Sequence, residues 1–385
     1  MGNLIKVLTV FGTRPEAIKM APLVKELEKR EEIESIVCVT AQHREMLDQV
    51  LKLFNIEPDY DLDIMKEKQS LIGITTKVIE GLDNLIKSVK PDIILVHGDT
   101  TTTFAASYAA FCNQVKIGHV EAGLRTFNKY FPFPEEMNRK LTGAMADMHF
   151  SPTESSKMNL LREGIEEKDI FVTGNTVIDA MDKTVEDNYK FENDILNNID
   201  FEDKKVIMVT AHRRENWGEG IENICKALKS IVKRNKDVEL VYLVHLNPVV
   251  KDVVEKHLLN EERVQLLPPL DTKETHNLMN KSYMIMTDSG GLQEEAPHLG
   301  KPVLVLRDVT ERPEAVNSGT VKLVGTDYNV VLENAEELLY NEEFYKSMST
   351  AVNPYGDGLA SKRIVDNILY YFNKRKYKSE EFKGE

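Results

Sequence analysis

The sequence predicts an α/β protein with two Rossmann-like domains that face a cleft. First, a chain of 385 residues is longer than a domain with a single hydrophobic core usually is, which favours two domains. Second, apolar runs without polar alternation recur along the chain, which is typical of strands buried on both faces of a parallel sheet. Third, amphipathic stretches separate these runs from end to end, as right-handed βαβ units require.

The expected elements fall into two similar halves. In the first half, strands are predicted at 4–11, 35–40, 92–97, 115–120, 147–151 and 169–173. In the second half, strands are predicted at 206–211, 239–244, 264–267, 283–287, 302–306 and 321–324. Amphipathic helices are predicted at 16–30, 44–54, 70–88, 220–235, 330–340 and 359–378.

These elements suggest an N-terminal domain over 1–180 and a C-terminal domain over 181–358. The polar stretch 186–204 is typical of a boundary region. We expect the last segment, 359–385, to supply a closing helix that packs back on the first domain.

Composition limits the classes of partner. The net charge of −14 argues against a nucleic-acid or anionic-membrane partner, which would favour a basic surface. No apolar run reaches the roughly 18 residues that a membrane span needs. Cys38, Cys112 and Cys225 lie far apart in apolar segments, so we expect reduced core residues of a cytoplasmic protein and no cysteine metal site.

Three carboxylates follow apolar runs in the first half. Asp99 and Glu121 come directly after predicted strands, and Glu135 lies shortly beyond them. Ligands of parallel sheets bind beyond the carboxyl ends of the strands, where a carboxylate can act in proton transfer. The alternative is that these residues are helix caps and partners in loop salt bridges.

A phosphate-binding loop is predicted after the first strand. Gly12 suits a tight turn, Pro15 suits the first turn of a helix, and Arg14 and Lys19 add positive charge. Free N–H groups at such a helix start bind anions. The loop is not G-x-G-x-x-G, so a dinucleotide is not favoured; an ordinary strand-to-helix turn is the alternative.

A second such loop is predicted in the other half. Ser289, Gly290 and Gly291 open a helix after the strand 283–287, where the backbone can approach a diphosphate. Glu295, about one turn later, can accept from ribose hydroxyls, and Arg312 can contact phosphate. A tight turn without a ligand is the alternative.

Two further polar clusters end strands. His212 follows the strand 206–211 and is flanked by arginines, so it can hold phosphate charge or shuttle a proton. Gln42, His43 and Arg44 follow the second strand; taken alone, they indicate a helix start with solvated side chains.

Together these motifs resemble the non-hydrolysing UDP-N-acetylglucosamine 2-epimerases. The matching blocks span nearly the whole chain, at 12–22, 42–49, 97–103, 119–126, 134–139, 174–179, 212–215, 288–295, 310–315 and 353–358. The resemblance implies two Rossmann-like domains similar to the B-type glycosyltransferase fold, with a UDP-sugar between them. One departure is the segment 268–275, which lacks the aromatic residue that family members often place beside uracil.

The resemblance also implies a mechanism. The enzyme would interconvert UDP-GlcNAc and UDP-ManNAc by eliminating UDP to give 2-acetamidoglucal and adding it back with the opposite C2 configuration. By resemblance, the catalytic residues are Asp99, Glu121, Glu135 and His212. The residues implied to hold UDP are Arg14, Lys19, Ser289, Gly290, Gly291, Glu295 and Arg312.

The family pattern implies neither a cofactor nor a metal. A second UDP-GlcNAc is implied as an activator near Gln42, His43 and Arg44, and a homodimer is expected. The product would enter surface polysaccharide or glycan synthesis. The alternatives are a hydrolysing epimerase that releases free ManNAc, a B-type glycosyltransferase that uses a UDP-sugar, and a catalytically silent nucleotide-sugar sensor.

Overall fold

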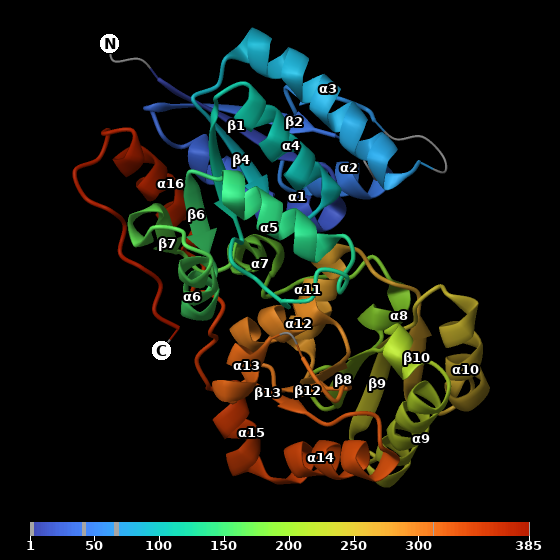
Figure 1. Cartoon of the computed structure of the whole chain (residues 1–385). Helices are drawn as coiled ribbons and strands as arrows, with labels where there is room; N and C mark the ends of the chain where they lie inside the picture. The colour runs from blue at the N-terminus through green and yellow to red at the C-terminus, as the bar shows by residue number, and fades with distance from the viewer. Residues whose placement is uncertain (1–3, 41–43, 65–68, 311, 385) are drawn as a thin grey trace. The chain divides into compact units, whose positions relative to one another are not determined.

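The computed structural model describes residues 4–40, 44–64, 69–310 and 312–384, with the side chains of 44–46 left out. The chain divides into two compact units. The first unit contains Met1–Ala180 and Tyr355–Gly384, and the second contains Met181–Pro354 (Figure 1). The division lies ahead of the polar stretch 186–204, which belongs to the second unit.

The first unit is built on a parallel sheet of seven described strands in the order β3-β2-β1-β4-β5-β6-β7. The six strands expected in this half are confirmed, with ends shifted by one or two residues. The two-residue β3 was missed, because both of its residues are exposed and neither belongs to an apolar run. The strands are β1 (Ile5–Phe11), β2 (Ile33–Val39), β3 (Tyr60–Asp61), β4 (Ile93–His97), β5 (Lys116–Val120), β6 (Met148–Ser151) and β7 (Ile170–Val172).

Helices cover both faces of this sheet because neighbouring residues of a strand point to opposite sides. Val7 of β1 packs in one apolar cluster with residues of α1, α2 and α16, whereas Leu8 packs in another with residues of α3 and α4. The helices are α1 (Arg14–Leu27), α2 (Arg44–Leu53), α3 (Leu71–Val89), α4 (Thr101–Cys112), α5 (Glu135–Met145), α6 (Glu154–Arg162), α7 (Thr176–Thr184) and α16 (Ala360–Tyr371).

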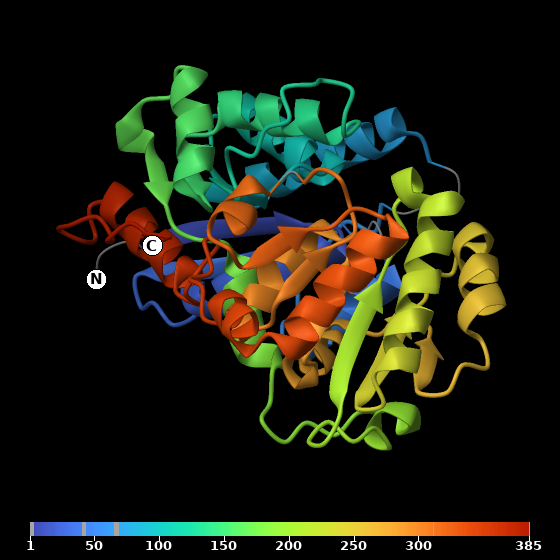
Figure 2. The ribbon, with the colours of Figure 1, turned by 90° about the horizontal axis from the view of Figure 1, so that it is seen from below.

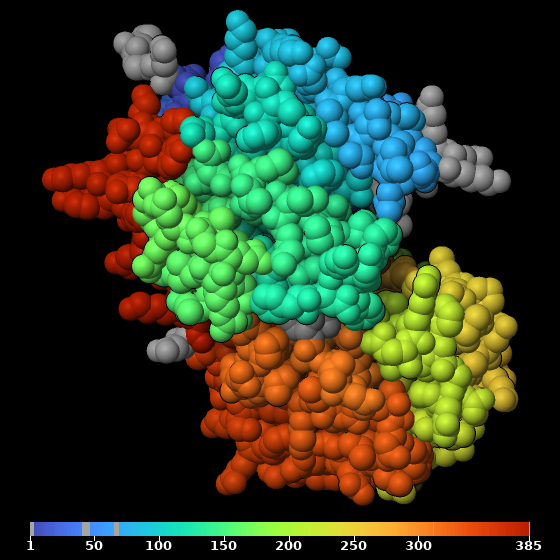
Figure 3. Space-filling model, viewed as in Figure 1, coloured from blue at the N-terminus to red at the C-terminus, as the bar shows by residue number. Residues whose placement is uncertain are grey.

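The C-terminal helix α16 belongs to the first unit although it follows the second in sequence. It packs against α1, and both ribbon views show the red C-terminal segment returning to the first unit (Figures 1 and 2). The carboxylate of Asp179 accepts hydrogen bonds from the N–H groups of Ala360 and Ser361 at 3.1 and 2.7 Å, which caps the start of α16. The expected helix over 359–378 is too long, because Asn373 adopts a φ of 57° that ends it. Most residues beyond lie at the surface (Figure 3), whereas Phe382 is buried.

The second unit repeats this strand order with one strand fewer. Its described strands form a parallel sheet in the order β10-β9-β8-β11-β12-β13, and all six were expected. The strands are β8 (Lys205–Thr210), β9 (Val238–Leu243), β10 (Val264–Leu267), β11 (Met284–Thr287), β12 (Val303–Val305) and β13 (Val321–Leu323). The helices are α8 (Asp194–Asn197), α9 (Glu219–Arg234), α10 (Pro248–Leu258), α11 (Thr272–Lys281), α12 (Gly290–Glu295), α13 (Pro313–Asn317), α14 (Tyr328–Tyr340) and α15 (Glu342–Ser349).

The sequence predicted buried cysteines and no membrane-spanning segment. Cys38 and Cys225 are buried as predicted, but Cys112 is exposed, so its assignment to the core is wrong. Cys112 is the last residue of α4, and the apolar run that contains it is longer than the face of the helix that packs inward. Among the described residues, every helix is too short or too polar to span a lipid bilayer.

Candidate active site

The candidate site of the first unit lies where β1, β4, β5 and β7 end. In both sheets, the order reverses beside the first strand of the unit, and α/β proteins bind ligands at such a point. Three residues in the turns after β4 and β5 have left-handed backbones: Gly98 with a φ of 64°, Glu121 with a φ of 60° and Gly123 with a φ of 95°. A positive φ is uncommon for a residue with a side chain, and such strain is concentrated at functional sites.

The carboxylate of Glu121 lies beside polar side chains from three other parts of the unit. Lys19 of α1 forms an ion pair with Oε2, and the side-chain amide of Asn175 donates to the same atom at 2.9 Å. The Nε2 atom of His97 lies 3.6 Å from this oxygen. Burial by itself would raise the pKa of Glu121, but the charge of Lys19 and the contact with His97 hold this pKa well below its ordinary value.

Asp99 is held by a separate set of contacts. Arg139 of α5 forms an ion pair with its Oδ2, and the Asn138 amide donates to its carbonyl oxygen at 2.9 Å. The Nε2 atom of His119 lies 2.7 Å from the carbonyl oxygen of Gly98. Burial lowers the pKa of His119 to about 3, so the ring is neutral and its Nε2–H donates to Gly98. The turn that carries Asp99 is therefore fixed on both sides.

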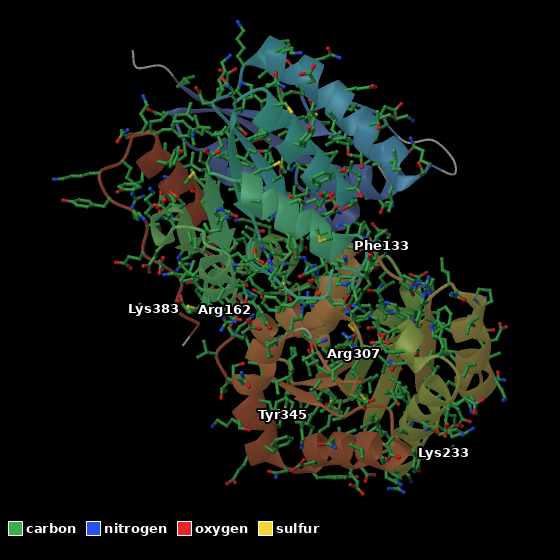
Figure 4. The ribbon with its side chains drawn as sticks, viewed as in Figure 1. Phe133, Arg162, Lys233, Arg307, Tyr345 and Lys383 are labelled. Atoms are coloured by element: carbon green, nitrogen blue, oxygen red, sulfur yellow. The ribbon has the colours of Figure 1, made fainter. Side chains whose placement is uncertain are left out.

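Glu135 differs from the other two carboxylates. It is the first residue of α5 and is partly exposed, and its side chain has no ion pair or hydrogen bond within the described ranges. The next residue, Glu136, is fully buried and accepts from the N–H groups of Thr126 and Phe127 at 3.1 and 3.0 Å. Glu136 therefore ties down one end of a loop whose Phe133 is exposed (Figure 4).

The predicted anion loop after β1 is arranged differently from the expectation. The Glu16 carboxylate accepts from the N–H groups of Gly12 and Thr13 at 3.0 and 2.8 Å, and the N–H of Glu16 bonds to the Thr13 hydroxyl. The prediction of free N–H groups is therefore wrong for these residues, because a capping box satisfies them. Gly12 is required for close packing, since an added Cβ would overlap the hydroxyl of Thr40.

The two cations predicted near this loop lie on α1. Arg14 begins the helix and is partly exposed. Lys19 lies one turn further along and is paired with Glu121 as described above. The expectation that Pro15 lies in the first turn of a helix is confirmed, and the helix begins one residue earlier, at Arg14.

In the second unit, His212 lies beside a fully buried carboxylate. Asp288 Oδ2 accepts from the N–H groups of His212 and Arg213 at 2.8 Å each and from the Asn216 amide at 3.0 Å. The Nδ1 atom of His212 lies 3.6 Å from the other oxygen, and its ring stacks on that of His245 with centroids 5.1 Å apart. Burial lowers the pKa of His212, although Asp288 opposes this shift. Asp288 thus fixes the backbone that carries His212.

Ser289, Gly290 and Gly291 form the start of α12 as predicted, but the Ser289 side chain makes no capping bond. The carboxylate of Glu295 lies 3.5 Å from Nε2 of His276. The Nδ1 atom of His276 in turn lies 2.6 Å from the Thr184 hydroxyl.

Arg312 precedes α13 and is held by the helix α12. Its Nε donates to the buried Glu294 carboxylate at 2.7 Å, and the Thr310 hydroxyl donates to Gln293 at 2.6 Å. These contacts connect the loop before α13 with the loop of Gly290, so both expected UDP-binding segments of this unit are linked.

The expected activator residues are largely outside the described chain. Gln42 and His43 lie outside the described residues, and Arg44 begins α2 with an undescribed side chain. Within the described ranges, no cluster of three or more histidine, cysteine or acidic side chains could hold a metal ion.

Sequence reasoning missed several residues that hold the predicted carboxylates. Asn175 and Arg139 contact Glu121 and Asp99, and Glu136 fixes the loop before α5; all three lie in the family blocks. For Asn175, a polar residue shortly after a strand was the available signal. His97 and His119 lie within apolar runs that predict strands, and a histidine in such a run does not by itself indicate a functional role.

The comparison with known proteins identifies the family. The family model described as UDP-N-acetylglucosamine 2-epimerase matches residues 25–369. The chain belongs to the UDP-N-acetylglucosamine 2-epimerase family. A relative of that name from Bacillus subtilis is 58% identical over 380 residues, which cover 99% of both proteins.

Solved structures of UDP-N-acetylglucosamine 2-epimerases share this fold. The enzyme from Neisseria meningitidis bound to UDP-GlcNAc is 52% identical, with a TM-score of 0.85 over 95% of this chain and 100% of that one. The S. aureus protein MnaA in complex with UDP is also 52% identical, with a TM-score of 0.89 over 99% and 100%. A glycosyltransferase from Rickettsia africae shares the fold alone, at 15% identity and a TM-score of 0.62 over 96% and 99%.

Proposed function

We propose that this chain interconverts UDP-GlcNAc and UDP-ManNAc by elimination of UDP to 2-acetamidoglucal and re-addition of UDP at C1, with the proton returning to the opposite face of C2. The observation that carries the proposal is the pair Asp99 and Glu121, two cation-paired carboxylates at the strand ends of a member of this epimerase family. The hydrogen on C2 of the sugar has no carbonyl neighbour, so simple deprotonation would give an unstabilised carbanion. Elimination avoids this carbanion because the electrons left at C2 form the C1–C2 double bond as UDP leaves.

The carboxylates of the first unit are proposed to act on the sugar. A general base must be ionised before turnover, and the low pKa of Glu121 supports that state. Asp99 pairs with Arg139, which holds its carboxylate in position. Glu135 begins α5 and has no ion pair among the described residues, so its carboxylate is proposed to act on the sugar directly. We assign no face of C2 to any of the three.

The second unit is proposed to hold UDP. The backbone at Ser289, Gly290 and Gly291 can approach a diphosphate, and Arg312 adds positive charge on a neighbouring loop. Glu295 is proposed to accept from ribose hydroxyls.

Two cations of the first unit and His212 complete the assignment. Arg14 and Lys19 are proposed to stabilise the negative charge of the departing diphosphate. Lys19 also keeps Glu121 ionised. His212 is proposed to contact UDP or to shuttle a proton at the leaving oxygen. Its backbone is fixed by Asp288, which supports a positional role.

Further properties are proposed from the family. A second UDP-GlcNAc is proposed to bind as activator near Gln42, His43 and Arg44. The working form is proposed to be a homodimer in the cytoplasm, where the reduced state of Cys38 and Cys225 is maintained.

Proton NMR of UDP-GlcNAc incubated with the enzyme in D2O tests the proposal. We expect UDP-ManNAc signals and deuterium at C2 in both product and recovered substrate. Complete retention of the C2 hydrogen during turnover would contradict elimination, and accumulation of free ManNAc would indicate a hydrolysing epimerase instead. A parallel reaction with EDTA is expected to proceed at the same rate; loss that a divalent ion restores would contradict the metal-independent mechanism.

A further inference from the structure

Asn175 is a buried polar residue in the loop between β7 and α7, with 3% of its surface exposed. Its N–H donates to the carbonyl of Tyr355 at 2.6 Å, and its Oδ1 accepts from the N–H of Val177 at 3.1 Å. Since Val177 supplies a donor, the oxygen of the side-chain amide must face it, and the NH₂ group must face Glu121. The direction of the Asn175 amide is therefore fixed by the backbone.

The loop that carries Asn175 is packed closely against another segment of the first unit. Gly174 has a φ of 85°, and an added Cβ there would lie 3.3 Å from the Cα atom of Gly356. An added Cβ on Gly356 would approach a side-chain atom of Ile178 to 2.9 Å. These close approaches leave little room for the loop to move, so Asn175 is a rigid donor.

The polar side chains around Glu121 all lie closest to one of its oxygens. Lys19, Asn175 and His97 contact Oε2, whereas Oε1 accepts no hydrogen bond from the described part of the chain. An added Cβ on Gly98 would lie 3.7 Å from Oε1, so this oxygen faces the turn that leads to Asp99. The two carboxylate oxygens of Glu121 therefore differ: Oε2 is held by protein groups, and the lone pairs of Oε1 remain available to accept a proton.

We propose that Asn175 is a positioning residue that holds Oε2 of Glu121 and thereby presents Oε1 as the oxygen that exchanges a proton with the sugar. This inference rests on the proposed epimerase function. A neutral amide suits the role because it orients the carboxylate without adding a second full charge beside Lys19, which would weaken Glu121 as a base.

Substitution of Asn175 by Asp and by Ala tests this role. The Asp variant places a second carboxylate against Oε2 of Glu121, and like charges raise the pKa of a carboxyl. The other titratable groups that face Glu121 are Lys19 of α1 and His97 of β4, and both remain. We expect the acid limb of the kcat–pH profile to move up by about one unit or more in Asn175→Asp.

The Ala variant removes the donor without adding charge. We expect kcat to fall about 10–100-fold, as for loss of a hydrogen bond to a charged group, with KM changed less than about threefold. Asn159→Ala is the matched control: this amide donates to the carbonyl of Gly123 at 3.0 Å, on a nearby turn but not on a carboxylate. We expect the control to retain its kcat and its pH profile.

The outcomes separate the two proposals. If the wild-type enzyme forms no UDP-ManNAc, the proposed function fails. If wild type is active but folded Asn175→Ala keeps native kcat, or folded Asn175→Asp keeps the native acid limb, the positioning role is wrong and the proposed function stands. Should Asn175→Asp not fold, Asn175→Ser replaces it; a lower Tm with unchanged kcat and pH profile in the Ala and Ser variants would then overturn the role.

Discussion

Two buried histidines in the neighbouring strands β5 and β6 predict a loss of stability in mild acid. His119 and His149 are each 1% exposed, and burial lowers their pKa values from 6.5 to about 3 and about 4. Near pH 6, the two histidines therefore bind protons in the unfolded chain but not in the folded chain. Because of this difference, the free energy of unfolding falls as the pH drops below 6.5. From the 1.36 kcal/mol per pKa unit of proton linkage, each histidine should cost about 2 kcal/mol between about pH 7 and about pH 5. Together, about 4 kcal/mol is a large part of the 5–15 kcal/mol typical of a folded protein.

Urea unfolding at the two pH values measures this loss. Gln is the matched substitution for His119, because its amide can replace the Nε2–H that donates to Gly98. We expect His119→Gln to lose about 2 kcal/mol less than wild type over this range, and the double variant with His149→Gln about 4 kcal/mol less. A double variant that loses as much stability as wild type would refute the reasoning.

Three further predictions concern the site. Asp99→Asn, Glu121→Gln and Glu135→Gln should each lower kcat about 10²–10⁴-fold with UDP affinity nearly unchanged, because a carboxamide cannot exchange a proton at neutral pH; a variant with near-native kcat would not be catalytic. Arg312→Ala should weaken UDP binding about 10–100-fold by calorimetry through loss of a charge-assisted contact, and unchanged affinity would remove Arg312 from the UDP site. Glu16→Gln should lower the free energy of unfolding by about 1–2 kcal/mol, since it weakens a capping box; equal stability in urea would show that the box contributes little.

The fold was largely predictable because parallel strands are buried on both faces. Such strands are continuous apolar runs, and all twelve expected strands exist in the structure. The strand β3 was not predictable from apolar runs. Tyr60 and Asp61 form an exposed edge strand of two residues, and its pairing with β2 depends on tertiary contacts. Cys112 shows another limit, because an apolar run gives no sign of which side of a helix faces outward.

The site was predictable as a set of residues but not as a set of contacts. Residue type and position at a strand end indicated Asp99 and Glu121. Their cation partners, Arg139 and Lys19, come from 40 and 102 residues away, so only the folded chain brings them together. The loop of Gly12 was interpreted as an anion site because Glu16 was not considered as a competitor for its N–H groups.

The ion pairs indicate how binding and catalysis would be connected in the proposed enzyme. Lys19, Arg139 and Arg312 have 17%, 12% and 18% of their side chains exposed, and each contacts a carboxylate. A cation that is so poorly hydrated is costly without a counter-ion, so these pairs keep the positive charges in place before substrate arrives. A diphosphate that approaches Lys19 would compete with Glu121 for its charge, and a weaker pair would raise the pKa of Glu121. Binding of UDP would therefore make Glu121 a stronger base in the complex than in the free enzyme, when the C2 proton has to be removed.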